Sequence, residues 1–423
     1  MVKFIRGVSR KTWVFLGLAV GVYLIVQVLL SVGVLNDFWS TIIRQGAVMA
    51  ILALGLNLIY GFNGQFSLGQ FGFYAIGAYA SADVTYRWTL LQTANGVTVL
   101  FMVVVLVGVA ILGLRQLLSR IRGVDALSAF ALYLVLTIVA GALAVVIGGA
   151  LAGPVTTLLN LLPPGWSLQV VFFLAILLGG LLAAEVSFLF GLPVLMLGSD
   201  YFGIATLGFT IIVKVLFDNS DTMFGFAEMK GARGMVGIPQ LSSWFWMFVF
   251  LLAVVVITRN ILQSSYGRAI VSVREDEIAA MSMGIDVASF KTFTFVLGSL
   301  FAGIAGGLYA HVGGFLVPDS FNFVKSFDPM IVVVLGGLGS VTGTVAASFI
   351  WSLVLEGLLR LVLPQGFETW RYVVYPLLLL VMMLLKPSGL FGNFEIPYLR
   401  QALPALRLKN NPAPAEATQG SKA

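Results

Sequence analysis

Long apolar segments separated by short polar breaks are the feature that most constrains how this chain of 423 residues can fold. A helix needs about 20 apolar residues to cross the hydrocarbon core of a bilayer, where every backbone polar group must be paired within the protein. Hydrophobic residues make up 59% of the chain and charged residues 10%, against roughly 25% charged residues in typical soluble proteins. The sequence therefore predicts an all-α polytopic membrane protein with roughly 10–12 transmembrane or re-entrant helices. The apolar segments lie at residues 13–35, 45–61, 66–86, 97–114, 124–150, 168–194, 201–217, 244–259, 291–311, 328–341, 343–363 and 371–386.

Positive charge lies beside these segments in four clusters. Such placement is typical of cytoplasmic loops that lie beside the membrane. The net charge of +6 therefore reflects contact with a lipid surface, and we exclude nucleic acid as a partner. If the first helix starts inside, an even number of spans puts all four clusters in the cytoplasm. Both termini are then predicted to be cytoplasmic, and residues 160–167, 218–240 and 313–329 to face outward. The clusters are Lys3 to Lys11, Arg115 to Arg122, Arg259 to Arg274, and Lys386 to Lys409.

Several kinds of chemistry lack the residues they need. The chain has no cysteine and a single histidine, His311, which excludes sulfur-based metal centres, a thiolate nucleophile and paired-histidine metal sites. No G-x-x-x-x-G-K-[ST] phosphate loop occurs, so any ATP must be hydrolysed by another chain. No G-x-S-x-G nucleophile motif occurs either, which disfavours an intramembrane enzyme. We expect no catalytic residue, no metal and no cofactor.

One membrane domain accounts for most of the chain. Residues 1–44 are predicted to form an N-terminal membrane helix and an outward loop, and residues 45–396 the main membrane domain. Residues 397–423 are polar and predict a disordered cytoplasmic tail.

A charged stretch, "SVREDEIAAMSMGID" at 272–286, interrupts this apolar chain. Ser272 and Glu275 have the spacing of a capping box, which predicts that a helix starts there. Acidic residues in its first turn suit the helix dipole, and Gly284 is placed to end it. The predicted helix is too charged for lipid and so lies in the cytoplasm.

This predicted helix also carries apolar residues at helical spacing. Ile278, Met281 and Ile285 recur every three or four residues, with Ala279, Ala280 and Met283 beside them. Two interpretations stay open. The helix folds back on its own membrane domain, or it docks in a groove of a cytoplasmic partner.

Small and polar residues mark close packing and helix breaks inside the membrane region. Gly298, Ala302, Gly306 and Ala310 recur every four residues, which lets another helix approach, either within the chain or at a subunit interface. "GGLGSVTG" at 336–343 breaks helix regularity, and the short segment 328–341 could be re-entrant. Polar residues near the breaks are candidates for a substrate path, or they satisfy neighbouring backbone groups. They are Asn57, Asn63, Gln65, Ser67, Gln70, Thr206, Ser340 and Thr342.

Four long stretches resemble the permease subunits of branched-chain amino acid ABC importers, specifically the longer, M-type partner. They are "LGLNLIYGFNGQFSLGQFGFYAIGAYASA" at 54–82, "GSDYFGIATLGF" at 198–209, "GRAIVSVREDEIAAMSMGIDVASFKTFTFVLGSLFAGIAGGLYAHVGGFLVPDSF" at 267–321, and "VVVLGGLGSVTGTVAASF" at 332–349. The resemblance covers roughly residues 45–86 and 190–390. Residues 115–165 look longer than is usual in the family, and the family gives this extension no role.

The resemblance implies that residues 260–290 form the coupling loop, with a short cytoplasmic coupling helix that sits in a groove of the ATP-hydrolysing subunit. It assigns this role to Arg274, Glu275, Asp276, Glu277, Ile278, Ala279, Ala280, Met281 and Gly284. Glu277 stands one position from the place of the family's glutamate. The implied partners are two cytoplasmic ATPase subunits, a second related permease and a periplasmic substrate-binding protein, in a bacterial cytoplasmic (inner) membrane.

The function so implied is a permease subunit that moves branched-chain or related amino acids and couples their passage to ATP. A urea or amide permease of the same family is one alternative. An ion-coupled secondary transporter is another, and Glu185, inside the 168–194 segment, would then be its ion site.

Overall fold

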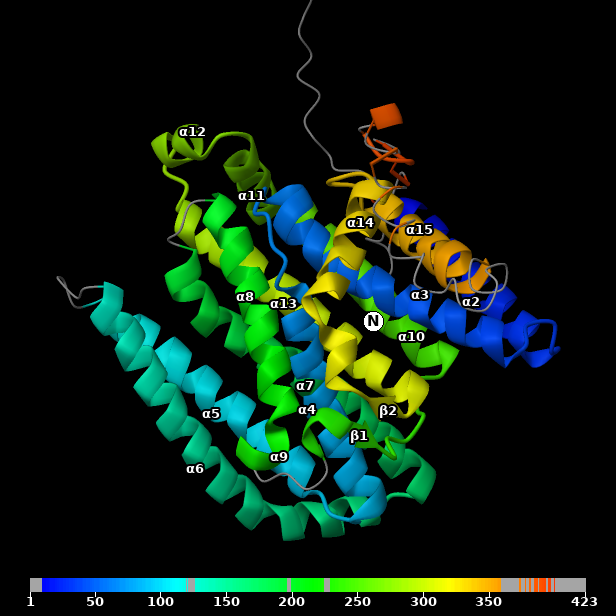
Figure 1. The fold of residues 1–423 in the computed structure, drawn as a ribbon, viewed down its shortest axis with the longest axis vertical. Coiled ribbons are helices and arrows are strands. Elements are labelled where there is room, and N and C mark those ends of the chain that lie inside the picture. Colours follow the sequence, from blue (N-terminus) through cyan, green and yellow to red (C-terminus); the bar gives the residue numbers. More distant parts are fainter. Residues whose placement is uncertain are drawn as a thin grey trace, which may run out of the picture.

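Long helices build almost the whole of the described chain. The computed structural model describes residues 10–118, 120, 126–195, 199–223 and 229–358, and scattered positions between 373 and 399. Figure 1 shows the helices packed against one another at different tilts in a single bundle. The elements are, in order, α2 (Arg10–Ser31), α3 (Asp37–Leu56), the π-helix η1 (Asn57–Phe62), α4 (Gln70–Leu90), α5 (Asn95–Leu118), α6 (Ala126–Asn160), α7 (Pro164–Val194), α8 (Ser199–Asp218), α9 (Ser220–Met223), the 3-10 helix η2 (Gly231–Arg233), β1 (Met235–Val236), α10 (Trp244–Gln263), α11 (Ser265–Glu275), α12 (Glu277–Ser282), α13 (Val287–Gly313), β2 (Phe315–Leu316), the 3-10 helices η3 (Pro318–Phe321) and η4 (Phe323–Ser326), α14 (Phe327–Gly336), α15 (Val341–Trp351) and the π-helix η5 (Ser352–Leu358).

Helices occupy every apolar segment that lies within the described residues, so the predicted all-α polytopic fold is confirmed. In this part of the chain, eight helical spans are long and apolar enough to cross a membrane. α14 has 10 residues and is about 15 Å long, half the thickness of a hydrocarbon core of about 30 Å, so it does not cross by itself. Most of the last apolar segment, 371–386, lies outside the described residues. The eight spans are 37–62, 95–118, 128–160, 164–194, 201–218, 244–263, 287–313 and 341–358.

Glycines let the central helices α3, α4, α7 and α13 approach backbone to backbone. A side chain on Gly306 of α13 would overlap the carbonyl oxygen of Tyr74 on α4. A Cβ on Gly303 would lie 2.7 Å from Cβ of Ala183 on α7, and one on Gly298 would lie 2.6 Å from the carbonyl oxygen of Gly55 on α3. The glycine face of α13 therefore packs against helices of the same chain, which is the first of the two predicted uses of this face.

Two loops predicted to face the same side meet at one end of the bundle. β1, from the 218–240 loop, pairs with β2, from the 313–329 loop, in the register Met235 to Leu316. Nζ of Lys214 at the end of α8 lies 3.5 Å from Oδ1 of Asp319 in η3. α11 and α12 lie at the opposite end of the bundle (Figure 1). The two sets of loops are thus separated as the charge pattern predicts.

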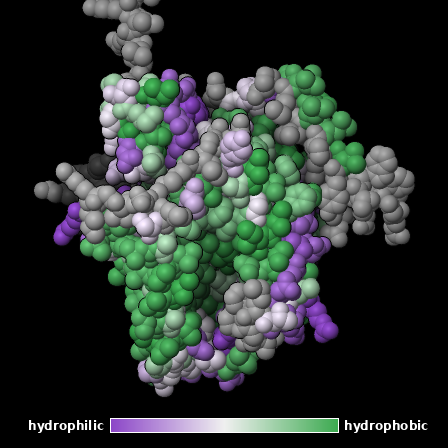
Figure 2. All heavy atoms as spheres, turned by 60° about the vertical axis from the view of Figure 1, so that its left-hand side comes forward, coloured by the Kyte–Doolittle hydropathy of each residue, from purple (hydrophilic) through white to green (hydrophobic). Residues whose placement is uncertain are grey.

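The extension at residues 115–165 forms an outer helical hairpin. α6 packs along α5, and both lie at the edge of the bundle in Figure 1. Figure 2 shows hydrophobic residues over most of the visible flank and hydrophilic residues mainly near its margins. This distribution suits a surface that meets lipid between its two ends.

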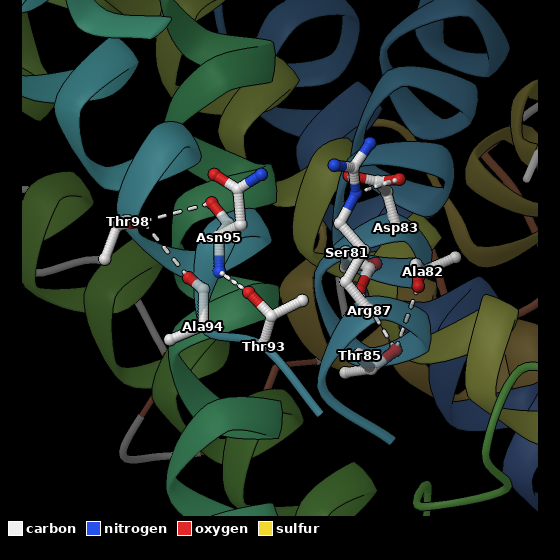
Figure 3. Close-up of polar contacts among 9 residues, drawn as sticks. All are labelled: Ser81, Ala82, Asp83, Thr85, Arg87, Thr93, Ala94, Asn95 and Thr98. Carbon is white, nitrogen blue, oxygen red and sulfur yellow. Dashed lines mark hydrogen bonds and ion pairs between the residues drawn. The ribbon is translucent and has the colours of Figure 1, made fainter. Parts of the chain in front are cut away.

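Several polar groups at the junction of α4 and α5 form local hydrogen bonds. Arg87 Nε donates to Asp83 over 3.0 Å, and the backbone amide of Asn95 donates to Oγ1 of Thr93 over 3.1 Å (Figure 3). The Thr98 hydroxyl donates to the carbonyl oxygen of Ala94 over 3.1 Å (Figure 3). The first bond lies within the end of α4, and the other two lie at the start of α5.

Candidate coupling and translocation site

The loop at 260–290 folds as two short helices with a break at Asp276. The backbone of Asp276 is extended, with φ −159° and ψ 112°, and its Oδ1 accepts hydrogen bonds from the amides of Ile278 (2.8 Å) and Ala279 (2.9 Å). Asp276 is therefore the N-cap of α12. The predicted capping box is wrong. Ser272 lies inside α11, where its hydroxyl donates to the carbonyl oxygen of Ala269 over 2.8 Å.

Gly284 ends α12 as predicted. Its φ is +81°, in the left-handed region that favours glycine, and its amide donates to the carbonyl oxygen of Met281 over 2.9 Å. The amide of Ile285 donates to the carbonyl oxygen of Ala280 over 3.1 Å. Together these two bonds form a Schellman motif, which reverses the chain toward α13.

The two sides of α12 meet different surroundings. Ala280 is 3% exposed and packs in a small cluster with Val273 of α11 and Val287 of α13. Ile278 and Met283 are 73% and 82% exposed. The expectation that Ala280 shares the exposed face is wrong. The fold-back interpretation holds for the side that carries Ala280, and docking of the uncovered side in a partner's groove stays a prediction.

Charged pairs fix α12 to the helix that follows it. Nζ of Lys291 on α13 lies 2.5 Å from Oε1 of Glu277. Asp286 caps α13, and the hydroxyl and amide of Ser289 donate to its carboxylate over 2.6 and 3.2 Å. These bonds lower the pKa of the Asp286 carboxyl. Glu277 thus has a structural partner on α13.

Arg274 joins this end of the chain to the helix break after α3. Its Nη1 donates to the carbonyl oxygen of Gly61, in the π-helix η1, over 2.7 Å. Gly64, with φ +78°, leaves room for the Arg274 stem, since a Cβ there would lie 3.0 Å from Arg274 Cγ. π-helical turns are frequent at functional sites, and here one accepts the side chain of the charged loop.

The same break is tied to the glycine turn between α14 and α15. Nδ2 of Asn57 donates to the carbonyl oxygen of Ser340 and to Oγ1 of Thr344, each over 2.9 Å, and its Oδ1 accepts from the amide of Gly339 over 3.0 Å. Asn57 is fully buried. The Asn57 side chain therefore holds η1 against the glycine turn. This turn also lies next to Arg274, since a Cβ on Gly339 would be 3.2 Å from Nη1 of Arg274.

The predicted path residues form two groups, both buried except for Thr342, which is half-buried. Asn57, Ser340 and Thr342 surround the glycine turn; Ser340 Oγ accepts from the amide of Gly343 over 2.9 Å, and Thr342 donates to Glu395 over 2.6 Å. These contacts fit the capping of α15. The remaining five residues lie in or beside the unwound segment between η1 and α4: Asn63, Gln65, Ser67, Gln70 and Thr206.

Hydrogen bonds hold part of this second group. Asn63 Nδ2 donates to Oε1 of Gln65 over 2.9 Å, and Oγ1 of Thr206 accepts from the amide of Leu68 over 3.0 Å. Within the described residues, neither amide atom of buried Gln70 has a hydrogen-bond partner. The role of these residues in a substrate path stays a prediction.

A second polar site escaped the sequence reasoning. A cavity of about 160 Å³ opens between α3, α4, α13, η4 and η5, and Lys325, Asp328 and Glu356 line it together with aliphatic residues of α3. Nζ of Lys325 lies 3.2 Å from Oδ2 of Asp328. Charged residues inside apolar segments were the available signal, since Asp328 starts the 328–341 segment and Glu356 lies within 343–363.

Glu185 has different surroundings. It faces α5, where a Cβ on Gly108 would lie 3.1 Å from its Oε1. No group of three or more acidic or histidine side chains suited to a metal ion occurs among the described residues. The alternative role of Glu185 as the ion site of a secondary transporter stays a prediction.

These features define a multi-pass, all-helical membrane protein with a short helical loop at one end and a polar cavity inside its bundle. The model of the family described as branched-chain amino acid transport system, permease component, matches residues 38–383, and the chain belongs to that family. This is a family of transport permeases rather than of enzymes.

Individual relatives agree with the family match. Over 275 residues, the chain is 32% identical to the high-affinity branched-chain amino acid transport system permease protein LivM of Escherichia coli (strain K12), a match that covers 58% of this chain and 61% of the relative. It is 28% identical over 247 residues to the probable LivM of Methanocaldococcus jannaschii, covering 53% of this chain and 70% of the relative. It is 27% identical over 232 residues to the permease protein LivH of E. coli, covering 55% and 71%. The chain thus spans about three fifths of the length of the LivM proteins of E. coli and Salmonella typhimurium. No solved structure matches it significantly.

Proposed function

We propose that this chain is a transmembrane subunit of an ATP-driven importer and that it forms part of the path for branched-chain or related amino acids. A separate ATPase subunit supplies the energy. One observation carries the coupling role: α12 exposes Ile278, Met281 and Met283 at one end of the bundle while its other side is fixed on α11 and α13. An apolar helix face outside the membrane suits the groove of a partner protein.

The contacts of Arg274 and Asn57 suggest how movement reaches the membrane region. When the ATPase subunits close, they shift α11 and α12 as a unit, because Ala280 and the Glu277–Lys291 pair bind α12 to its neighbours. Arg274 passes this shift to η1 through Gly61, and Asn57 passes it to the glycine turn. The importer then exchanges between outward-open and inward-open states, a two-state change biased by differential binding.

The proposal includes the other parts of such an importer. We place the chain in a bacterial cytoplasmic membrane, with both termini in the cytoplasm, beside a second related permease, two ATPase subunits and a periplasmic binding protein. The family match and the likeness to both LivM and LivH support a pair of related permeases. The positive clusters beside the apolar segments support the orientation.

Reconstitution tests this function. The chain, its partner permease and the ATPase subunits are placed in proteoliposomes with the binding protein outside, and uptake of radiolabelled leucine is measured. We expect uptake to require ATP inside and to continue when ionophores collapse ion gradients. Uptake that follows an ion gradient without ATPase subunits identifies a secondary carrier. Uptake of urea in place of leucine identifies an amide permease of the same family.

A further inference from the structure

We propose that the cavity between α3, α4, α13, η4 and η5 binds a zwitterionic amino acid with an aliphatic side chain. This inference rests on the proposed function and adds the position of the substrate within the chain. The cavity differs from the group of polar residues around the unwound segment 63–69, because none of those residues lines it; its lining comes from α3, the start of α4, Tyr309 of α13 and the region 320–356.

The polar side of the cavity carries groups of both signs. Asp328 and Glu356 supply two carboxylates and Lys325 supplies one ammonium group. The side chain of Asp328 is only 10% exposed and that of Lys325 is 26% exposed, so both are largely removed from water. A zwitterion brings one group of each sign: its ammonium group suits the carboxylates, and its carboxylate suits Lys325. Because such a ligand adds no net charge, it enters a partly buried site at lower cost than an ion does.

Aliphatic side chains form another part of the lining. Val48, Met49 and Leu52 follow one face of α3, and Phe71 of α4 stands beside them. Ligand sites are commonly apolar with a few polar groups that fix orientation. The lining thus combines charged groups with aliphatic ones, as leucine, isoleucine and valine do.

The cavity is large enough for one such molecule. Its volume is about 160 Å³, similar to an apolar cavity of about 150 Å³ that holds benzene. An amino acid such as leucine has about half as many non-hydrogen atoms again as benzene, and the cavity is partly open, so a ligand can reach it. A peptide or a large hydrophobic solute would not fit.

A π-helix borders this cavity, and another π-helix contacts Arg274. The described residues form two π-helices: η1 accepts Arg274, and η5 contributes Ser352 and Glu356 to the cavity. α3 joins the two places, since Val48 and Leu52 line the cavity and Gly61 follows at the far end of the same helical span. A ligand in the cavity therefore contacts the helix that Arg274 holds.

Equilibrium binding to the assembled transporter tests the inference. The complete complex is placed in lipid nanodiscs without binding protein, and binding of radiolabelled leucine is measured with alanine and lysine as competitors. We expect saturable binding that alanine displaces weakly and lysine does not. Asp328→Asn and Lys325→Met should each weaken leucine binding at least about tenfold, because each removes a charge that faces the ligand.

A larger side chain in the cavity should change the selectivity between amino acids, an effect that misfolding does not produce. Leu52→Phe narrows the aliphatic side, so leucine binding should weaken about tenfold or more while alanine binding changes less than about threefold. Matched controls are Asp37→Asn, an exposed acid on the same helix, and Val135→Phe, an exposed residue of α6; both should bind leucine as the wild type does.

The outcomes separate this inference from the proposed function. If the wild type imports leucine with ATP but shows no saturable binding, or if the three cavity variants bind like the wild type, the cavity is not the site and the function stands. If lysine displaces radiolabelled leucine as well as unlabelled leucine does, the selectivity for an aliphatic zwitterion is wrong. If the wild-type complex imports no amino acid at all, the proposed function itself fails.

Discussion

Arg274 and Gly61 are joined by a hydrogen bond of 2.7 Å between residues that lie 213 positions apart in the chain. The donor belongs to a helix outside the membrane spans, and the acceptor belongs to a π-helix that continues the span of α3. The bond is charge-assisted, and such bonds contribute about 1.5–3 kcal/mol. It is a direct contact through which the exposed loop can act on η1 and the membrane region.

Replacing this arginine tests the contact. Arg274→Met keeps most of the stem that packs over Gly64 and removes the donor to Gly61. We expect ATP-driven uptake to fall at least about tenfold while the ATPase subunits still co-purify with the permease, since no exposed residue of α12 changes. Arg268→Met, an exposed arginine of the same helix, is the control and should transport normally. Normal uptake by Arg274→Met would show that coupling takes another route.

The stability of the membrane domain should depend on the two hydrogen bonds that the Asn57 amide group donates. Asn57→Asp preserves shape but replaces the amide group that donates to Ser340 and Thr344 by an acceptor. A buried acceptor facing a carbonyl oxygen should destabilise the membrane domain by roughly 2–4 kcal/mol and lower its thermal midpoint, which can be measured by fluorescence unfolding in detergent. Asn219→Asp at an exposed position should leave the midpoint unchanged. An equal midpoint for both variants would contradict the assigned hydrogen bonds.

The glycine turn should not accept a side chain. A Cβ on Gly343 would overlap the carbonyl oxygen of Gly336, so Gly343→Leu must separate α14 from α15. We expect this variant to lose most uptake. Gly21→Leu on α2, where nothing lies within 4 Å, should retain it. Near-normal uptake by both variants would mean that the turn tolerates opening.

Orientation in the membrane is predicted by the positive clusters. Cysteines at positions 120 and 268 should react with an impermeant maleimide only from the cytoplasmic side, and cysteines at 160, 230 and 319 only from outside. The chain has no native cysteine, so the background is low. Position 409, predicted to be cytoplasmic, lies outside the described residues and can be tested in the same way. Outside labelling at 268 would overturn both the topology and the docking of α12.

Sequence reasoning was most successful where one physical constraint dominates. Lipid requires long apolar helices, so the segments could be located from hydropathy alone. Glycine spacing correctly indicated the close approach of Gly298 and Gly306 to neighbouring helices, because such contact needs the absence of a side chain. Gly284 was correctly placed because a left-handed residue at the end of a helix favours glycine.

The errors concern choices that local pattern does not determine. Ser272 and Asp276 can both cap a helix, and the packing of Val273 beneath α12 favours a break at Asp276. The direction of Ala280 depends on where α13 lies, which the period of a six-residue helix does not reveal. The cavity was missed because its lining residues come from positions 45 to 356 and meet only in the folded chain.

The most direct test of the central claim is binding of the ATPase subunit to variants of α12. Ile278→Asp and Met283→Asp place charges on its exposed apolar side, and Ser265→Asp adds the same charge at an exposed position of α11. The measurement is the amount of ATPase that co-purifies with each permease variant of unchanged monodispersity. We predict that Ile278→Asp and Met283→Asp lose the ATPase and ATP-driven uptake, because a charge would be buried in the groove, whereas Ser265→Asp keeps both. Full ATPase binding and normal uptake by Ile278→Asp and Met283→Asp would contradict the proposal that α12 couples this membrane protein to ATP.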